Sequence, residues 1–396
     1  MNQQIRPLSG IRVLDASRVL AGPFCGALLA DLGAEVIRLE HPNQTDEVRT
    51  WEPIIDGISA AYLAVNHSKR GIALDMSSPD GLDLMKRLLE RSDILLENFR
   101  VGTLERLGLG ETVLKALYPR LIHCAIRAFP KGVGDADLPG YEASIQAYTG
   151  IMHATGEYGR EPVRCGPSVV DLSTGLSAVI SILIALRERD RLGTGQYVEP
   201  ALMRTATQLL GPQVTGYFMA DVLPVRYGSG HERLVPYQNF KCSDGFLLIA
   251  GGNDRLWKKL CQVLAIPSGP DGLPYPTLAM RTRNREAVVK LVADRVANHT
   301  RSELRQTLGA AGVPCAPVND IGEYLNQPGL REAGVLQPLA DDGLFMLPGM
   351  LFGSETVPAP KRTPPPATGE HTLEILGELG IAMPEIERLR AQGTIR

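Results

Sequence analysis

Short apolar runs alternate with helix-like segments over residues 11–126, and this alternation restricts the fold more than any other feature of the 396-residue sequence. The predicted strands are 11–14, 35–39, 71–75, 93–97 and 121–126, and the predicted helices between them are 23–31 and 79–91. Gly33 ends the first helix, and Ser78 followed by Pro79 begins the second. This order predicts an α/β fold, in which helices cover a mostly parallel sheet and ligands bind at the carboxyl ends of its strands.

Some classes of function are disfavoured by the sequence. No GxGxxG follows the first predicted strand, so we do not expect a nicotinamide or flavin enzyme. The six cysteines form no CxxC pair and the seven histidines no HExxH pattern, so we expect reduced thiols and no metal. A net charge of −3 gives no electrostatic reason to expect a nucleic acid or an anionic membrane as partner. The first ten residues resemble no leader, and no apolar run reaches about 18 residues, which predicts a cytoplasmic protein.

The length predicts two domains, because single hydrophobic cores stop growing at about 250–300 residues. After a predicted helix at 202–218, the pattern changes to a glycine-rich loop and two short strands that turn at 243–245. Further helices are predicted at 255–264, 286–298 and 302–311, and a terminal helix follows the proline-rich segment 357–366. We therefore predict a large domain built from 1–224 and 329–396, and a smaller α+β domain at 225–328.

One acidic residue, Asp171, stands where a short apolar run at 168–170 meets a long helical pattern that we expect to begin at Ser173. A carboxylate ahead of a helix faces unpaired backbone N–H groups and the positive end of the helix dipole, which favours its ionised form. The simplest explanation is an N-cap, which contributes about 1 kcal/mol of stability. Ser173 and Thr174 are also capping residues, however, and this leaves Asp171 as a candidate nucleophile.

The chain resembles the class III CoA-transferases, the family of formyl-CoA transferase, carnitine CoA-transferase and succinyl-CoA–glutarate CoA-transferase. The resemblance lies in LSGIRVLDASRVLAGPFCGALLADLGAEVIRLEHP, SKRGIALDM, ILLENF, PGYEA, VVDLSTGLSA, RLGTGQYVE, VPYQNFKCSDG, GVPCAPVND and GEHTLEILGELG, in that order. It implies a Rossmann-like large domain made from both ends of the chain, a small domain between them, and two chains interlocked as a homodimer. It also implies an acyl-CoA and a small carboxylic acid as substrates, with no permanently bound cofactor.

The resemblance places the family's nucleophilic aspartate at Asp171, which would hold the acyl group as a mixed anhydride and then CoA as an aspartyl thioester. The family's glycine loop matches Gly228 and Gly230, whose backbone N–H groups would stabilise the oxyanions. A plain hairpin entry is the alternative explanation of that loop. Glu142 is a candidate for supporting either the active-site loop or Asp171.

For CoA itself, the resemblance implies contacts made largely by backbone groups. The matching positions are Leu20, Ala21, His41, Leu74, Asp75, Met76, Ser77, Asn98, Phe99, Arg100, Arg106, Leu138, Pro139, Gly140 and Tyr141. Arg106 is the strongest side-chain candidate for a CoA phosphate, although a lone helical arginine is often only solvated. Formyl-CoA transferase has His and Gln where Arg18 and Leu20 stand, and Arg where His41 stands.

Two rival functions remain at this point. The α-methylacyl-CoA racemases resemble the same family and use an Asp and His pair, but the position of their His is Tyr141 here, and tyrosine is a poor base at neutral pH. A catalytically silent CoA-binding scaffold would lack the nucleophile or the glycine loop, and both are present. The sequence suggests succinyl-CoA or a similar donor, and leaves Arg164, Arg226 and His231 as unranked candidate contacts for the acceptor.

Overall fold

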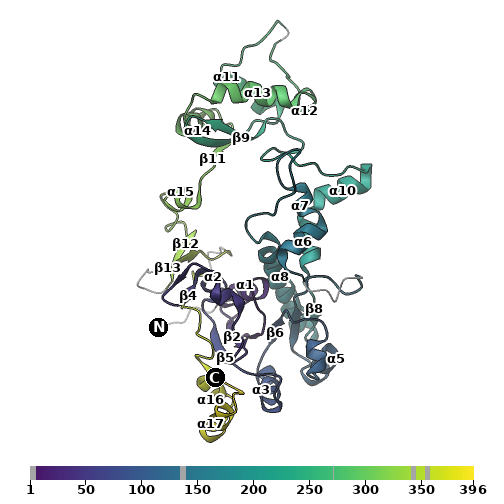
Figure 1. The fold of residues 1–396 in the computed structure, drawn as a ribbon, viewed down its shortest axis with the longest axis vertical. Helices are drawn as coiled ribbons and strands as arrows, with labels where there is room; N and C mark the ends of the chain where they lie inside the picture. Colours follow the sequence, from purple (N-terminus) through teal and green to yellow (C-terminus); the bar gives the residue numbers. More distant parts are fainter. Residues whose placement is uncertain (1–5, 134–139, 271, 340–344, 353–356) are drawn as a thin grey trace. The chain divides into compact units, whose positions relative to one another are not determined.

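The structure is a computed structural model that describes residues 6–133, 140–270, 272–339, 345–352 and 357–396 (Figure 1). The described residues form two compact units. The large unit consists of the chain up to Thr149, residues 165–214 and residues 329–396, and the small unit consists of 150–164 and 215–328.

The bounds of the two units differ from the predicted domains, which assigned 150–164 and 215–224 to the large domain. The structure groups both segments with the small unit. Two hydrogen bonds connect 150–164 to the residues after 224: Gly228 N–H donates to Gly156 O at 2.9 Å, and Arg226 donates to His153 O at 2.8 Å. Contacts between segments far apart in the sequence decide this division, and periodicity does not report them.

A six-stranded parallel sheet lies at the centre of the large unit. Its strands are β1 (Arg12–Asp15), β2 (Glu35–Glu40), β5 (Arg70–Ala73), β6 (Ile94–Glu97), β7 (Ile122–Ala125) and β8 (Tyr197–Val198). They lie in the order β5-β2-β1-β6-β7-β8, and all five pairings are parallel. In chain order this is the 3-2-1-4-5-6 arrangement of the Rossmann fold, so the predicted α/β sheet is confirmed. The order reverses between β1 and β6.

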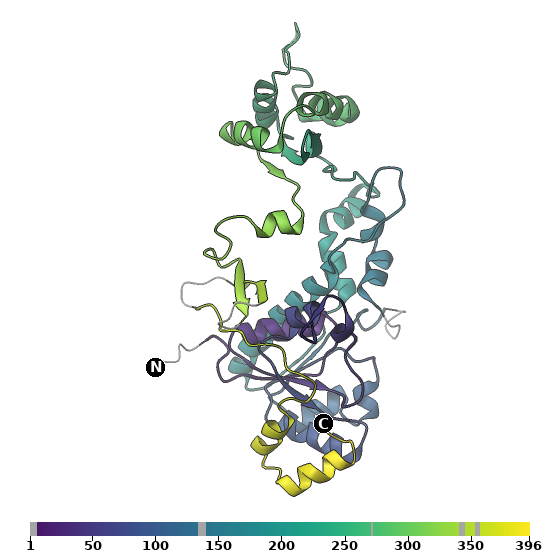
Figure 2. The ribbon, with the colours of Figure 1, turned by 60° about the vertical axis from the view of Figure 1, so that its left-hand side comes forward.

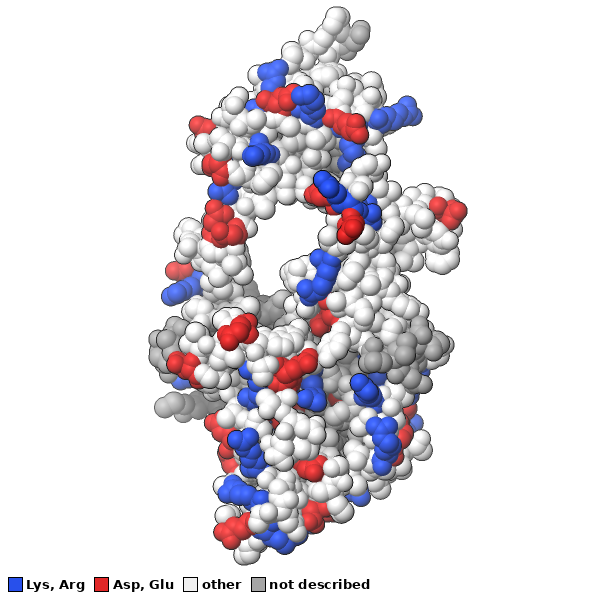
Figure 3. Space-filling model, viewed as in Figure 1, with Lys and Arg blue, Asp and Glu red and all other residues white. Residues whose placement is uncertain are grey.

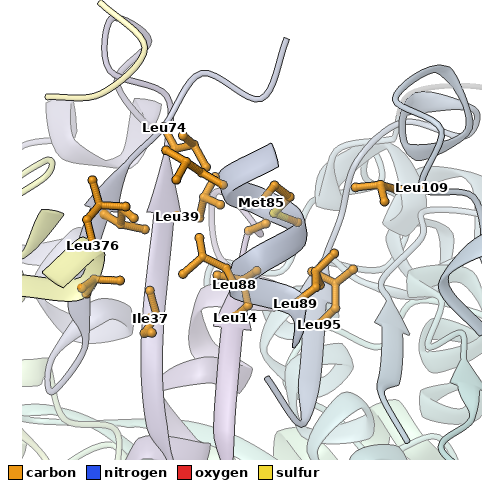
Figure 4. Packing of buried hydrophobic residues seen from close by; sticks show 14 of the residues in the cluster. Leu14, Ile37, Leu39, Leu74, Met85, Leu88, Leu89, Leu95, Leu109 and Leu376 are labelled. Atoms are coloured by element: carbon orange, nitrogen blue, oxygen red, sulfur yellow. The ribbon is translucent and has the colours of Figure 1, made fainter. Parts of the chain in front are cut away.

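Helices cover both faces of this sheet (Figures 1 and 2). On one face lie α1 (Ala21–Asp31) and α8 (Val169–Leu192), which pack against each other. On the other lie α3 (Pro79–Glu90), α16 (Thr372–Glu378) and α17 (Met383–Ala391). Figure 4 shows Leu88 and Leu89 of α3 over Leu14 and Leu95 of the strands, in a core where all four side chains are buried. The predicted terminal helix is confirmed as α16, and a second helix, α17, follows it after Gly380, whose φ is +77°.

The helix that carries Asp171 begins earlier than predicted. Val169 and Val170 are its first residues, and Leu172 N–H donates to Ser168 O at 3.1 Å as an early helical bond. The predicted strand at 168–170 is therefore wrong, and so is the prediction that Ser173 and Thr174 cap the helix: Thr174 Oγ1 donates to Val170 O inside it. A Val-Val pair favours a strand intrinsically, but here Val170 is fully buried, and tertiary packing overrides that preference. The helix ends at Leu192, and Gly193 follows as its C-cap with φ at +77°.

α8 is also the one helix of the described part that is long and apolar enough to cross a membrane by length and composition. Within its most apolar stretch, 44% is buried inside the chain. Its remaining apolar surface includes Ile180 and Ile184, which are 58% and 59% exposed. Figure 3 shows acidic and basic side chains interspersed on the face in view.

The small unit contains an antiparallel sheet of β9 (Tyr237–Cys242), β10 (Gly245–Ala250) and β11 (Cys315–Pro317). It is covered by α11 (Asp254–Val263), α12 (Leu278–Arg283), α13 (Arg285–Val296) and α14 (Arg301–Ala310). The predicted hairpin and the three predicted helices of this region are confirmed. The predicted helix at 202–218 is instead two helices, α9 (Leu202–Leu209) and α10 (Gly211–Ala220), with Leu210 between them.

The remaining elements are short. They are η1 (Glu47–Thr50), β3 (Ile54–Ile55), β4 (Ile58–Ser59), α2 (Ala60–Asn66), α4 (Thr103–Arg106), α5 (Glu111–Leu117), α6 (Glu142–Thr149), α7 (Ile151–Ala154), α15 (Ile321–Leu325), β12 (Leu336–Leu339) and β13 (Phe345–Pro348).

Candidate active site

A cavity of about 510 Å³ lies in the large unit, where the loops that follow β1, β6 and β7 meet. In open α/β sheets, ligands bind at the carboxyl ends of the strands where the strand order reverses, and β1 and β6 form that point here. The cavity is lined by Arg18, Val19, Leu20, Ala21, Glu47, Asn98, Phe99, Arg100, Val101, Thr103, Ile126, Arg127, Ala128, Gly140, Tyr141, Glu142, Asp171 and Leu202. The three acidic residues among them are Glu47, Glu142 and Asp171, and none of these lining residues is a histidine.

Asp171 lies at the third position of α8, in its first turn, and lines this cavity. It is the one acidic residue of that turn. The backbone N–H groups of a first turn have no intrahelical acceptor, and together with the helix dipole they favour an ionised carboxylate. The helix thus places a carboxylate at the cavity, although within the first turn of the helix and not at the predicted strand-to-helix junction.

Glu142 connects two elements that border the cavity. It is the first residue of α6, it is buried, and its Oε1 accepts from Gln146 Nε2 at 2.5 Å and from Val170 N–H in the first turn of α8 at 3.3 Å. Gln146 Oε1 in turn accepts from Cys165 N–H at 3.0 Å. These bonds hold the start of α8 against α6, and the Glu142 carboxylate thereby fixes the backbone of the residue that precedes Asp171.

Seven of the residues predicted to bind CoA line the cavity: Leu20, Ala21, Asn98, Phe99, Arg100, Gly140 and Tyr141. The side chain of Asn98 fixes the backbone of the β1 loop, because its Oδ1 accepts from Arg18 N–H at 2.9 Å and its Nδ2 donates to Arg18 O at 2.8 Å. Tyr141 stands at the position of the racemase histidine and is 67% exposed. Leu138 and Pro139 lie outside the described residues.

The other predicted CoA contacts do not line the cavity. His41 and Asp75 follow β2 and β5 at the same edge of the sheet, with 3.5 Å between His41 Nε2 and Asp75 Oδ1. Asp75 Oδ1 also accepts from the Ser77 hydroxyl at 2.6 Å, and this hydrogen bond is the main reason why the pKa of Asp75 lies below its ordinary value. Leu74 is buried in the core and Met76 packs against that core. Arg106, at the end of α4, donates to Thr103 Oγ1 at 3.0 Å.

The predicted glycine loop lies in the small unit, as do Arg164, Arg226 and His231. Gly228 has a φ of +59°, which favours glycine, and a Cβ at this residue would come within 2.3 Å of the Glu157 carboxylate, which would have to move. Both N–H groups expected to bind an oxyanion are occupied within the unit: Gly228 N–H donates to Gly156 O, and Gly230 N–H donates to Tyr227 O at 2.8 Å. Oxyanion binding by this loop therefore requires these two hydrogen bonds to exchange.

Sequence reasoning missed the pair formed by Glu97 and Arg127. Arg127 lines the cavity and makes two hydrogen bonds to the Glu97 carboxylate, at 2.9 and 2.7 Å, and a third to Phe99 O at 3.0 Å. Glu97 Oε2 accepts from Phe99 N–H at 2.7 Å. Burial by itself would raise the pKa of Glu97, but hydrogen bonds from His123 and Arg127 outweigh burial and lower it. The sequence does contain a signal for this pair, because Glu97 ends the apolar strand β6 and Arg127 follows the apolar strand β7.

The described residues contain no group of three or more His, Cys, Asp or Glu side chains that could hold a metal ion. The cavity itself brings the carboxylates of Glu47, Glu142 and Asp171 together with three arginines. Arg18 and Arg100 line it without an ion pair to any acidic residue in the part of the chain that the structure describes, whereas Arg127 is paired with Glu97.

Comparison with known proteins gives one family. A family model described as CoA-transferase family III matches residues 8–372. A succinate–glutarate CoA-transferase from Agrobacterium fabrum is 35% identical, and the match covers 94% of this chain and 96% of that protein. The human succinyl-CoA:glutarate CoA-transferase is 32% identical, with 95% and 86% covered, and a succinyl-CoA:mesaconate CoA-transferase from Haloarcula hispanica is 34% identical, with 94% and 96% covered.

The fold has matching solved structures. A CAIB/BAIF family protein from Brucella suis superimposes with a TM-score of 0.85 at 34% identity, over 95% of this chain and all of that one. A hypothetical protein from Mycobacterium tuberculosis superimposes with a TM-score of 0.83 at 26% identity, over 94% and 99% of the two chains.

Proposed function

This chain belongs to CoA-transferase family III and is a CoA-transferase, and from this membership we propose that it moves CoA from succinyl-CoA to a short dicarboxylic acid through covalent intermediates on Asp171. The observation that carries the proposal is the place of Asp171, an acid in the first turn of α8 that lines the cavity at the reversal of strand order. Three of the relatives named above carry names that pair succinate or succinyl-CoA with glutarate or mesaconate, which are dicarboxylates.

In the first half of the reaction, an Asp171 carboxylate oxygen attacks the thioester carbonyl of succinyl-CoA. The C–S bond breaks, CoA leaves as a thiolate, and a mixed anhydride joins Asp171 to succinate. The thiolate then attacks the aspartyl carbonyl of this anhydride, which releases succinate and leaves CoA on Asp171 as a thioester. The acceptor carboxylate repeats these two steps in reverse order and leaves as acyl-CoA, while the Asp171 carboxylate is restored. No proton is transferred, so no general base is needed.

Each attack creates an oxyanion, for which we assign Gly228 and Gly230 as donors after their present hydrogen bonds exchange. Glu142 supports the start of α8 through its bond to Val170 N–H. CoA binds along the carboxyl edge of the sheet, at the seven predicted residues that line the cavity and at His41, Leu74–Ser77 and Arg106; Leu138 and Pro139, predicted to bind it too, lie outside the described residues.

The guanidinium groups of Arg18 and Arg100, which form no ion pair within the described residues, support a dicarboxylate as substrate; that of Arg18 donates to Thr45 O at 3.2 Å. Arginine binds carboxylates through charge-assisted hydrogen bonds, and neither side chain has an acidic partner in the described part of the chain. A dicarboxylate placed with one carboxylate at Asp171 has a second carboxylate to pair with one of them. Comparison of succinyl-CoA with butyryl-CoA, which lacks that carboxylate, tests this directly: we expect a higher kcat/KM for succinyl-CoA, and equal values would contradict it.

A trapping experiment tests the covalent mechanism. An anhydride or thioester at Asp171 is more electrophilic than any resting side chain, so hydroxylamine should modify the protein only after an acyl-CoA is added. Digestion and mass spectrometry should find the adduct on the peptide that contains GPSVVDLSTG, and the Asp171→Asn variant should give none. An adduct on a different peptide would move the active site there. Transfer that proceeds without any adduct under rapid quench would favour direct transfer within a ternary complex.

We propose further that two chains interlock as a homodimer, that the enzyme works in the cytoplasm, and that it holds no permanent cofactor. Support for the dimer comes from apolar surface that the single chain leaves open. Ile180 and Ile184 of α8 are more than half exposed, and α10 has no buried residue and exposes Phe218 by 82%. Covering such surfaces with a second copy removes apolar area from water.

A further inference from the structure

Four charged side chains are buried beneath the loop that follows β1. Asp15 and Arg38 are 0% exposed, Asp46 is 1% exposed and Lys69 is 3% exposed. Lys69 Nζ donates to Asp15 Oδ2 at 2.8 Å, to Pro23 O at 2.8 Å and to an asparagine oxygen at 2.9 Å, so its three protons are all used. Arg38 pairs with Asp46 and lies 3.7 Å from Asp15. Two acids and two bases thus lie together, almost wholly removed from the protein surface.

Three of these charged groups form hydrogen bonds with the backbone of Ser17 and Val19, which flank Arg18 in the loop. Arg38 donates to Ser17 O, and Ser17 N–H donates to Asp15 Oδ1 at 3.0 Å. Val19 N–H points to the Asp46 carboxylate, at 3.3 and 3.4 Å from its two oxygens. Arg18, between them, is held at both its N–H and its carbonyl by Asn98. Every residue of the loop from 17 to 19 is therefore fixed by a side chain from another part of the chain.

Val19 needs such support. Its φ is +68°, a left-handed conformation that a β-branched residue adopts only under constraint and at a cost of about 1–3 kcal/mol. Val19 lines the cavity together with its neighbours Arg18, Leu20 and Ala21. A strained residue thus lies in the cavity wall, and Arg38 and Asp46 supply the contacts on each side of Arg18.

Two glycines of helix α1 allow the helix to pack closely against Asp15, Ser17 and Lys69. A Cβ at Gly26 would come within 2.8 Å of Asp15 Oδ2 and 3.0 Å of Lys69 Nζ. A Cβ at Gly22, four residues earlier on the same face, would come within 2.2 Å of Ser17 Oγ. Two glycines inside a helix lower its intrinsic stability by about 1 kcal/mol each relative to alanine, so the close approach carries a cost.

Buried ion pairs of this kind often stabilise a protein no more than apolar residues of the same volume would. What apolar residues cannot supply is a set of hydrogen bonds that selects one conformation of the cavity wall. We infer that Arg38 and Asp46 are positioning residues, which hold the loop 17–19 in its strained conformation so that the wall of the cavity is preformed for CoA. This inference rests on the proposed function only in taking the cavity as the CoA site.

The test compares Arg38→Met with Arg362→Met. Arg362 forms another buried pair of the large unit, with Asp31 at 3.0 and 2.5 Å, and neither residue lines the cavity. A preformed wall improves the binding of CoA equally in the ground state and in the transition state. Arg38→Met should therefore raise the Kd for CoA and the KM for succinyl-CoA about tenfold, and should change kcat by less than about threefold. Arg362→Met should lower the melting temperature and leave both constants unchanged.

Asp46→Asn serves if Arg38→Met does not fold. Asparagine keeps the size and an acceptor for Val19 N–H but loses the ion pair with Arg38, and it should raise the same two constants in the same direction. The inference would be overturned if Arg362→Met raised the Kd for CoA as much as Arg38→Met or Asp46→Asn does. It would also be overturned if the folded Arg38→Met and Asp46→Asn variants kept the wild-type Kd for CoA and KM for succinyl-CoA. Calorimetric binding of CoA separates this result from the proposed function, because a wild-type enzyme that binds CoA but transfers none refutes only the latter.

Discussion

At the scale of single residues, the reaction depends on one carboxylate. Asp171→Asn keeps the size and shape of the side chain but removes the nucleophilic oxygen anion, so we expect CoA transfer to fall by at least about a thousandfold. Asparagine also loses the interaction of a negative charge with the helix N-terminus, which is about 0.3–1 kcal/mol. Acyl-CoA formation followed by chromatography, beside a thermal melt, measures the two effects. Turnover near that of the wild type would remove Asp171 from the mechanism.

The lowered pKa of Glu97 predicts how the free energy of unfolding changes at acid pH. Its pKa in the folded protein lies below its ordinary value of 4.5, because the His123 and Arg127 hydrogen bonds outweigh burial. A carboxylate with a lowered folded pKa stabilises the fold above its unfolded pKa, and that contribution is lost as the pH falls through the folded value. Glu97→Gln should therefore be less stable by about 3 kcal/mol at pH 7, since Arg127 loses its partner, and should lose less stability than the wild type below pH 4.5.

The control for this prediction is Glu188→Gln on the surface. Glu188 also has a lowered pKa, caused mainly by a hydrogen bond from Arg191, but the pair is solvated. Denaturant unfolding across the acid range should give nearly parallel curves for Glu188→Gln and the wild type. A Glu97→Gln curve that also runs parallel to the wild type would show that Glu97 does not contribute to the acid dependence.

At the scale of elements, the position of α8 depends on its contact with α1. A Cβ at Gly175 would lie 2.8 Å from Ala21 O and 2.9 Å from a Phe24 ring carbon, so the two helices touch at a residue one turn after Asp171. Alanine is normally favoured over glycine in a helix by about 1 kcal/mol. Here Gly175→Ala should instead destabilise the protein by about 1–3 kcal/mol, because backbone must move to admit the methyl group.

Gly309→Ala is the matched control, because Gly309 lies in α14 and a Cβ there would meet nothing within 4 Å. This variant should stabilise the protein by about 0.5–1 kcal/mol. Thermal or denaturant unfolding measures the change in the free energy of unfolding of both variants. A change of the same sign in both would contradict the close packing of α1 on α8. Gly175→Ala should also lower kcat, since the displaced helix carries Asp171.

At the scale of the whole molecule, the proposed dimer predicts that dilution does not yield monomers. Interlocked chains cannot separate without opening their folds, so the purified protein should keep a dimer mass at nanomolar concentration in mass photometry. Ile184→Glu on α8 should reduce the dimer fraction, whereas Leu117→Glu on α5, at a similar exposure of 56%, should not. A folded and active monomer at nanomolar concentration would contradict the proposal.

The sequence by itself determined the elements whose causes are local. The first five strands of the sheet in chain order and helices α1 and α3 lie within about two residues of their predicted bounds, because apolar periodicity and caps such as Ser78, which accepts from Gly81 N–H, act over a few residues. The family match then identified Asp171 and seven residues that the structure places in the same cavity.

Tertiary structure decided what depends on distant partners. Burial of Val170 turned a predicted strand into the first turn of α8, and contacts with 226–228 moved 150–164 into the small unit. The buried network beneath the β1 loop joins residues as far apart as Asp15 and Lys69, and the Glu97–Arg127 pair crosses from β6 to the end of β7. No local pattern reports such pairings, because the free energy of a buried charge depends on which other groups the fold brings within hydrogen-bonding distance.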